Sequence, residues 1–409
     1  MTQDYESKNN FFNLVVLGIC QAFFFCGRTL TFFAAALVSI SILGDDLTYA
    51  TAPVTAMLVG TSVATLPAAF LMRRWGRKLG FSFGAMIGCA GALVAAHAIA
   101  IESFSIFNLG IFISGLYGGF AQQYRFAAAE VAPKHLREKN VSIVIAMSVL
   151  GAFIGPETAM IAKYWIYAVP FQGTMIMLAL FYMLSAIIVL FAKIPLLTNE
   201  EFEDKGRRLS AIAKLPTFII AVIAGLLGYV VMNFLMVVTP LTMETFKSVV
   251  FSHENIKLVI QWHVVGMFLP GFLTGHLIKK LGVGKVIAIG ATIFLTSVFV
   301  ALHGLTFSHF LVSLILLGVG WNFTFTGATV LIAEIHSPAE RAKVQGTNDF
   351  IIFTGLAISS LMAGGIYSHF GWNWINYAML PVILVILFSA LWLHFVSRKG
   401  SNMAIAAAD

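Results

Sequence analysis

The sequence has little charge: only 11% of its 409 residues are Asp, Glu, Lys or Arg, whereas an ordinary soluble protein has about 25%. Hydrophobic residues make up 59% of the chain. This balance excludes an ordinary soluble globular protein. The pI of 9.3 and the net charge of +7 do not indicate nucleic-acid binding, because the charges lie in short clusters between apolar runs and form no basic stripe.

Cysteine and catalytic motifs are also scarce. The three cysteines, Cys20, Cys26 and Cys89, lie in apolar runs without metal-type spacing, and they are typical of small buried residues. The ten histidines are scattered, and the chain contains neither an HExxH nor a GxSxG pattern. We therefore expect no enzyme, metal site or cofactor, and no receptor, because a sensor would add a soluble domain.

Long apolar runs are what the chain has instead. A membrane-spanning helix needs about 20 mostly apolar residues, and no short hydrophobic segment with a cleavage site indicates a signal peptide. The sequence predicts twelve spans, at 12–39, 50–72, 79–101, 104–131, 141–162, 172–195, 216–240, 256–278, 283–303, 308–335, 343–367 and 373–396.

The positions of Lys and Arg predict the orientation, because short cytoplasmic loops carry the positive excess. With the N-terminus inside, 20 of the 25 basic residues fall in the cytoplasm, and Arg28 and Arg125 lie within spans. We expect both termini in the cytoplasm of a bacterial inner membrane. The polar segment 197–215 then divides the chain into six-helix bundles at 1–196 and 216–409, and we interpret it as a solvated linker.

The two halves resemble each other. LMRRWGRKLGF after the second span is echoed by LIKKLGVGKVI after the eighth. With twelve spans and a central linker, these loops resemble the G-x-x-x-D-R-x-G-R-R loop of the major facilitator superfamily, although its acidic position is Arg73 in one half and Lys279 in the other. The resemblance covers nearly the whole chain, and it implies an all-α membrane fold of twelve helices in two pseudo-symmetric halves.

The resemblance also implies gate and latch residues at the cytoplasmic helix ends: Arg73, Arg74, Gly76, Arg77, Glu130, Arg137, Lys279, Lys280, Gly282, Glu334, Arg341 and Asp349. In the family, the acid of the loop faces the start of span eleven. Because that acid is missing here, we hypothesise a reversed latch in which Asp349 of QGTNDF meets Arg73 or Arg74. The alternative is that Arg73 serves only to orient the protein in the membrane.

Span five contains an ionisable side chain. Gly151-Ala-Phe-Ile-Gly155-Pro156-Glu157 resembles the glycine-rich pattern of proton-coupled antiporters, although the usual second glycine pair is absent. Desolvation inside a span would raise the pKa of the Glu157 carboxyl toward the range useful for carrying a proton. The alternative is a carboxylate wetted at the helix end.

The candidate substrate site follows from the architecture that the resemblance implies, in which spans one, four, seven and ten line the pathway. Among the polar and aromatic residues of these spans, the candidates for binding substrate are Arg28, Gln122, Tyr124, Arg125, Asn233, Trp321, Asn322 and Thr326. Gln122 and Arg125 share one helix face. An arginine within hydrocarbon is costly, so we expect Arg28 and Arg125 to bind anionic or accepting groups.

Transport is the function that these patterns favour. We expect a monomeric carrier that moves a small organic solute by alternating access, with proton coupling and no partner beyond substrate, protons and lipid. The phrases AQQYRFAAAE, GVGWNFTFTG and ERAKVQGTNDF resemble a bacterial branch that includes vitamin carriers of the riboflavin type. The alternative within transport is a proton-antiport exporter of drugs or siderophores, although spans one and seven lack the mid-span acid expected for cationic drugs.

Overall fold

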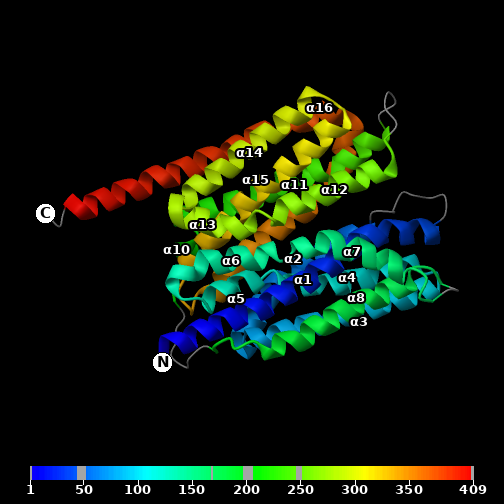
Figure 1. The fold of residues 1–409 in the computed structure, drawn as a ribbon, viewed down its shortest axis with the longest axis horizontal. Helices are drawn as coiled ribbons and strands as arrows, with labels where there is room; N and C mark the ends of the chain where they lie inside the picture. The colour runs from blue at the N-terminus through cyan, green and yellow to red at the C-terminus, as the bar shows by residue number, and fades with distance from the viewer. Residues whose placement is uncertain (1, 44–51, 167–168, 197–205, 246–250, 407–409) are drawn as a thin grey trace. The chain divides into compact units, whose positions relative to one another are not determined.

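The structure is a computed structural model that describes residues 2–43, 52–166, 169–196, 206–245 and 251–406. Every regular element in these residues is a helix (Figure 1). The first part of the predicted linker, 197–205, lies outside the described residues. The predicted all-α membrane fold is therefore confirmed for the described part of the chain.

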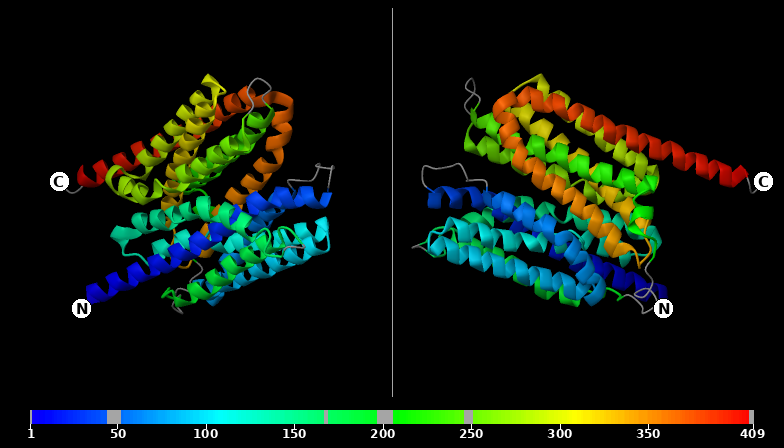
Figure 2. Two further views of the ribbon diagram at one scale, coloured as in Figure 1. Left: turned by 45° about the vertical axis from the view of Figure 1, so that its right-hand side comes forward. Right: turned by 180° about the vertical axis from the view of Figure 1, so that it is seen from behind.

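Eleven helical stretches in the described residues are long and apolar enough to cross a membrane. Each corresponds to one predicted span, and the predicted span that is not among them is 343–367. That segment is nevertheless helical throughout, as the first part of the long helix α16 (Arg341–Ala406). Gly371, with φ 72° and ψ −177°, interrupts α16 just before the predicted span 373–396, and the ribbon of α16 bends sharply between its orange and red parts (Figure 2).

The helices pack into two compact units. Unit 1 comprises Met1–Gly206 and His336–Ala357, and unit 2 comprises Arg207–Ile335 and Ile358–Asp409. Packing thus groups the start of α16 with the N-terminal helices. The division of the chain into domains at the linker stays a prediction.

Unit 1 contains the helices α1 (Thr2–Leu43), α2 (Ala52–Trp75), α3 (Arg77–Ala100), α4 (Phe104–Ala121), α5 (Tyr124–Glu130), η2 (Lys134–Leu136), α6 (Arg137–Ala146), α7 (Val149–Ala162), α8 (Gln172–Ile188) and η3 (Val189–Phe191). Helix α3 packs mainly against α4 and α8. A Cβ on Gly110 of α4 would lie 2.5 Å from the Ala95 nitrogen of α3. The glycine therefore permits the close helix approach that membrane packing favours.

Unit 2 contains α10 (Leu209–Ile212), α11 (Pro216–Thr245), α12 (His253–Phe268), α13 (Gly271–Leu281), α14 (Val283–His303), α15 (Phe307–Glu334) and the later part of α16. Helix α15 packs against α11, α12 and α14. It is therefore the central helix of this unit, and its polar residues are mostly buried.

Two glycine turns occupy the loops that repeat in the sequence. Gly76 has φ 81° and ψ 159°, and Gly282 has φ 86° and ψ 149°. Both values lie in a region that glycine almost alone adopts. The repeated loop sequence therefore corresponds to a repeated backbone conformation.

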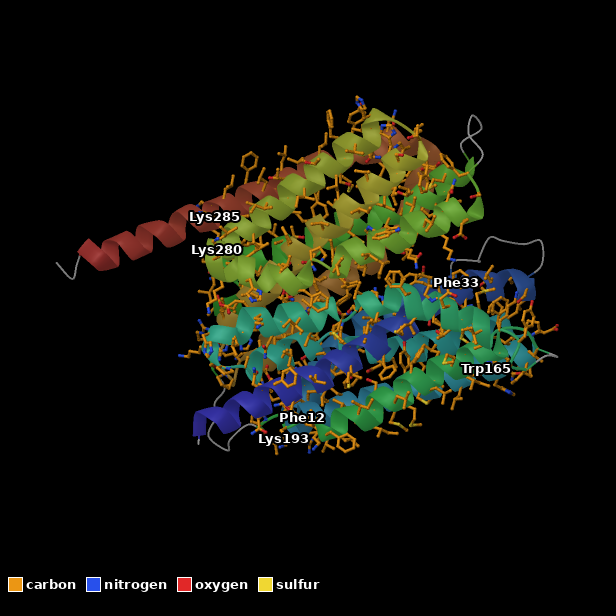
Figure 3. All side chains as sticks on the ribbon, viewed as in Figure 1. Phe12, Phe33, Trp165, Lys193, Lys280 and Lys285 are labelled. Carbon is orange, nitrogen blue, oxygen red and sulfur yellow. The ribbon has the colours of Figure 1, made fainter. Side chains whose placement is uncertain are left out.

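One polar contact fixes the end of unit 1 where α1 meets the chain after η3. The Asn13 amide donates to the Lys193 carbonyl at 2.9 Å and accepts from the Lys193 N–H at 2.7 Å. The Lys193 ammonium lies 5.7 Å from the centre of the Phe12 ring (Figure 3). The segment before the linker is thus anchored to α1.

Candidate functional site

A buried ionic cluster joins three helix ends in unit 1. We call it the carboxylate network; it comprises Arg77, Gln123, Glu130, Arg341 and Gln345. Arg77 is the first residue of α3, Glu130 the last of α5 and Arg341 the first of α16. The chain places Arg77 there because the glycine turn at position 76 ends α2 and starts α3 within one residue.

Glu130 is the centre of this network. Its carboxylate accepts from Arg77 Nε at 2.9 Å, from Arg77 Nη2 at 2.5 Å and from Arg341 Nη1 at 3.0 Å. Arg77 also donates to the side-chain oxygens of Gln123 and Gln345, each at 2.6 Å. The forked geometry is the one in which arginine binds carboxylates most strongly.

A small cavity of about 10 Å³ lies beside the network, lined by Ala69, Met72, Arg73, Arg77, Gln123, Arg341, Ala342 and Gln345. This volume is close to the minimum that one water requires. Gln123 Nε2 is buried and has no hydrogen-bond partner within the described residues. A single water in this cavity would have polar neighbours.

His336 adjoins the network from the turn between α15 and α16. Its Nδ1 donates to the Ser337 carbonyl at 3.1 Å, so its Nε2 accepts from the Gln345 amide at 2.9 Å. This is the bonding of a neutral imidazole. Burial lowers the pKa of His336 below its ordinary value, and the nearby Glu130 carboxylate opposes that shift.

The other predicted gate residues occupy less buried positions. Arg73 and Arg137 are half-buried, whereas Arg74, Lys279, Lys280, Gly282 and Glu334 are exposed. In the sequence, Glu130 and Arg137 after the fourth predicted span are echoed by Glu334 and Arg341 after the tenth. The structure instead brings Arg341 to Glu130. A gating role for these residues stays a prediction.

The predicted partner of Asp349 needs a correction. Asp349 Oδ1 accepts from Arg125 Nη2 at 2.5 Å and from the adjacent Asn348 amide at 3.0 Å, so its ionic partner is Arg125 and not Arg73 or Arg74. Asp349 lies eight residues beyond Arg341 on α16, about 12 Å along the helix. It is therefore too deep for the loop arginines and lies level with Arg125.

Arg125 lies just after a break in span four. Helix α4 ends at Ala121 and α5 begins at Tyr124. Arg125 Nη1 donates to Gln122 Oε1 at 3.0 Å, which places these two side chains together as their spacing predicted. The predicted anionic or accepting group of a substrate is not needed to balance the charge of Arg125, because Asp349 does so.

Tyr124 points into the interior of unit 1. Its hydroxyl bonds to those of Tyr117 at 2.9 Å and Ser185 at 3.3 Å, and its ring centre lies 4.3 Å from that of Phe81. The side chain is fully buried. This geometry favours a packing role over the predicted contact with substrate.

Arg28 is the other arginine within a span. Its guanidinium lies 5.9 Å from the ring centre of Phe25 and 5.7 Å from that of Phe32. Within the described residues it makes no ion pair. It is half-buried, so its donors are available to a ligand.

Unit 2 contains an aromatic cluster, which we define as Tyr229, Phe268, Trp321 and Phe325. Trp321 stacks on Phe325, with ring centres 4.8 Å apart and planes at 16°. Tyr229 and Phe268 meet Trp321 edge-on at 5.1 and 5.5 Å. The i, i+4 spacing of Trp321 and Phe325 on α15 produces this stack.

Two donors near this cluster lack partners. Trp321 Nε1 and Thr326 Oγ1 are buried and have no hydrogen-bond partner within the described residues. Buried polar groups are nearly always bonded, so each exception calls for a water or a ligand. The predicted residues Asn233 and Asn322, in contrast, are bonded to Ser359 and to Thr274 and Met267.

Glu157 lies on α7 with its side chain exposed. The glycines before it pack against α1, because a Cβ on Gly151 would lie 2.7 Å from the Phe25 ring and one on Gly155 would meet Thr29. Helix packing thus accounts for the glycine pattern. Protein packing therefore does not desolvate the Glu157 carboxylate, and its role in proton coupling stays a prediction.

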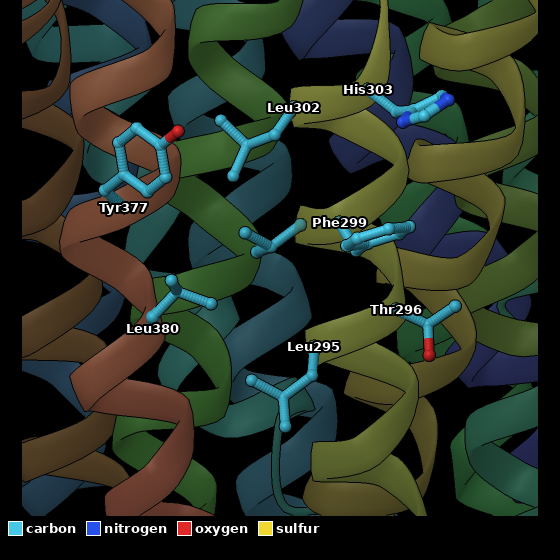
Figure 4. A pocket seen from close by; sticks show the side chains of 8 residues that line it. Leu295, Thr296, Phe299, Leu302, His303, Tyr377 and Leu380 are labelled. Atoms are coloured by element: carbon cyan, nitrogen blue, oxygen red, sulfur yellow. The ribbon is translucent and has the colours of Figure 1, made fainter.

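A larger groove lies elsewhere in unit 2, between α14 and α16 (Figure 4). Its volume is about 640 Å³, and it is lined by Leu295, Thr296, Val298, Phe299, Leu302, His303, Tyr377 and Leu380. Phe299 is 68% exposed. The groove belongs to spans nine and twelve, outside the predicted pathway, and carries no charged side chain that would bind a polar solute.

Sequence reasoning missed Gln345, Asn348 and His336. Gln345 and Asn348 belong to the QGTNDF segment; Gln345 follows Arg341 by four residues, and Asn348 and Asp349 follow Gln345 by three and four. That spacing places them on one helix face. The signal was present, whereas nothing local marked His336.

These features define a polytopic helical membrane protein with buried polar sites in its spans, which is the construction of a transporter. The sequence profile of the Major Facilitator Superfamily matches residues 17–251 and 221–407. The chain belongs to this superfamily, and its relatives are transporters.

Two bacterial relatives align with almost the whole chain. The riboflavin transporter RfnT of Brucella anthropi is 36% identical over 377 residues, which cover 92% of this chain and 94% of the relative. The uncharacterized MFS-type transporter YdeG of Bacillus subtilis is 29% identical over 91% of this chain and 89% of its own length.

Solved structures show the same fold. The human organic anion transporter MFSD10 has a TM-score of 0.76 at 14% identity, with 93% of this chain and 99% of that chain covered. The E. coli fucose:proton symporter FucP has a TM-score of 0.71 at 15% identity, with 93% and 98% covered.

Proposed function

We propose that this protein is a proton-linked carrier of a planar vitamin of the riboflavin type, working by alternating access in a bacterial cytoplasmic membrane with both termini inside. The observation that carries the proposal is the 36% identity with a riboflavin transporter over almost the full length of both chains. We propose that the carrier works as a monomer.

The site chemistry of unit 2 supports a planar aromatic substrate. Trp321, Phe325 and Thr326 are 1%, 3% and 0% exposed, so in this proposal the carrier opens the aromatic cluster during its transport cycle. The stacked pair then offers its ring faces to another flat ring, and the unpartnered Trp321 N–H donates to a ring nitrogen or carbonyl of the substrate. Thr326 adds a hydroxyl. We keep both residues, together with Asn233, among the proposed substrate contacts.

In unit 1, Arg28 is the proposed contact for accepting groups of the substrate. Its five N–H donors suit carbonyl, hydroxyl or phosphate oxygens. Arg125 leaves this part of the proposal, because Asp349 and Gln122 already bond its guanidinium.

Counterflow of labelled riboflavin into proteoliposomes tests the function. The wild-type chain should exchange riboflavin. Trp321→Phe should raise the riboflavin concentration needed for half-maximal exchange by about 2–13-fold, because it keeps a ring but removes one hydrogen bond worth about 0.5–1.5 kcal/mol. Trp165→Phe, at an exposed tryptophan at the end of α7 (Figure 3), is the matched control and should leave exchange unchanged.

The same assay addresses the exporter alternative. A panel of lipophilic cations and siderophores, added as competitors, should not inhibit riboflavin counterflow. Exchange of those compounds in place of riboflavin would refute the vitamin proposal. No contact in the described residues favours them, since the antiporter-like glycines of α7 serve packing.

A further inference from the structure

We propose that Asp349 is the proton-binding site of this carrier and that Arg125 is the charge released when the proton binds. The inference rests on the proposed function, because it names the group that would couple protons to substrate. It places the coupling carboxylate on α16 and not at Glu157, the acid that the sequence had pointed to.

The first step is the burial of the pair. Asp349 is 0% exposed and Arg125 is 3% exposed, and their contact joins α5 to α16 within unit 1. Charges inside a membrane protein are expensive and are kept where they carry ions or protons. Glu157, in contrast, is exposed on α7.

The second step is the half-satisfied carboxylate. Oδ1 accepts from Arg125 and from Asn348, whereas Oδ2 is buried and has no hydrogen-bond partner within the described residues. The neighbouring amide oxygen, Asn348 Oδ1, is also buried and unpartnered in the same residues. An ionised carboxylate can only accept, whereas a protonated one gains an O–H donor. The free oxygen is therefore the position at which a proton would bind.

The third step is the charge balance. Arg125 faces Asp349 from α5, and the guanidinium of Arg77 at the start of α3 is the other charge that acts on it; Glu130 holds Arg77. When one proton from water forms an O–H bond at Oδ2, no electrons are exchanged and the pair changes from neutral to singly positive. Arg125 then no longer faces the negative charge of Asp349, so the equilibrium shifts toward a state in which this arginine reaches water or electron-rich groups of the substrate.

The fourth step is the mechanical link. Helix α16 begins in unit 1 and continues into unit 2 between Ala357 and Ile358. Weakening the Arg125–Asp349 ion pair therefore loosens the attachment to α5 of a helix whose later part belongs to unit 2. Release of the proton restores the carboxylate and the ion pair. Proton uptake and helix release therefore become one event.

The test compares exchange with gradient-driven uptake in proteoliposomes containing the full chain. At one proton per substrate, a gradient of about one pH unit supports about tenfold accumulation. We expect wild type to show both activities. Asp349→Asn should retain counterflow but lose the tenfold accumulation, whereas the exposed carboxylate variant Glu254→Gln should keep both.

Accumulation that persists at about tenfold in Asp349→Asn would overturn the proposal, as would its loss in Glu157→Gln alone. Asp349→Asn removes the negative charge that faces Arg125 and could fail to fold, so the double variant Arg125→Gln with Asp349→Asn is the second test. It removes both charges and must also lose accumulation.

A substrate-free measurement separates this inference from the proposed function. Infrared difference spectra of the purified chain, recorded as the pH is lowered, should show a protonated carboxyl band that Asp349→Asn lacks. If wild type exchanges no riboflavin but shows this band, the substrate proposal fails and the proton site stands. Identical spectra for the two chains would refute the proton site.

Discussion

Replacing Glu130 by Gln tests whether the carboxylate network holds the end of unit 1 together. The Glu130 carboxylate accepts four hydrogen bonds, from Arg77 Nε and Nη2, from Arg341 and, at 3.4 Å, from Gln345. Gln keeps the size of the side chain but removes its charge. Two arginines then share a site without a carboxylate.

The expected loss in the free energy of unfolding of Glu130→Gln follows from how deeply Glu130 and its arginine partners are buried. Removing one member of a buried ion pair costs about 3–5 kcal/mol. Arg77 is 3% exposed, but Glu130 is 17% exposed, so water relieves part of the penalty and we expect about 2–3 kcal/mol. At about 2–4 °C per kcal/mol for a unit of this size, the Tm should fall by ~4–12 °C.

Thermal unfolding of the purified chain in detergent measures this loss. Glu138→Gln is the matched control, because Glu138 is a half-buried glutamate in the first turn of α6 with no ion pair in the described residues. Glu138→Gln should change the free energy of unfolding by no more than about 0.5 kcal/mol. Arg77→Lys should fall between the two, since Lys cannot form the fork. Equal Tm values for the Glu130 and Glu138 variants would refute the reasoning.

Two further predictions concern the loops. Gly282→Ala should lower the free energy of unfolding by about 1–3 kcal/mol through backbone strain alone, because a Cβ there would meet nothing within 4 Å. Gly365→Ala, whose Cβ would also meet nothing but lies in a helix, should instead raise it by up to about 1 kcal/mol. Equal Tm values for the two variants would contradict this reasoning. His336 has a lowered pKa, so the unfolded chain binds its proton at higher pH, and the free energy of unfolding should decrease as the pH falls from about 6.5 to the folded-state pKa. His336→Gln should flatten the Tm across that window, and an unchanged pH profile would show that another group titrates.

The sequence predicted the spans well because hydropathy is a local property. All but one of the predicted spans have a counterpart among the apolar helices, and the exception, 343–367, is the one that carries Asp349 in its first half. The turn glycines and the shared face of Gln122 and Arg125 were also predictable, since each depends on neighbours within a few residues.

Pairings between distant segments were not predictable. The partners of Glu130 lie 53 and 211 residues away, and Arg125 meets a residue 224 positions along the chain. Such contacts depend on which helices pack side by side, and composition does not encode this. The break at Gln122 was also hidden, because residues 120–130 contain no glycine or proline that would mark the end of a helix.

Two of the ionic links in unit 1 join α5 to α16, and their order specifies how these two helices align. On α5, Arg125 precedes Glu130; on α16, Arg341 precedes Asp349. Glu130 pairs with Arg341 and Arg125 with Asp349, so the helices run antiparallel with links of opposite polarity. A shift by one link would bring two arginines or two carboxylates together, which costs energy in a medium of low dielectric constant. Because both links must open for α16 to leave α5, a proton that weakens the deeper one also lowers the cost of opening the network at the helix end.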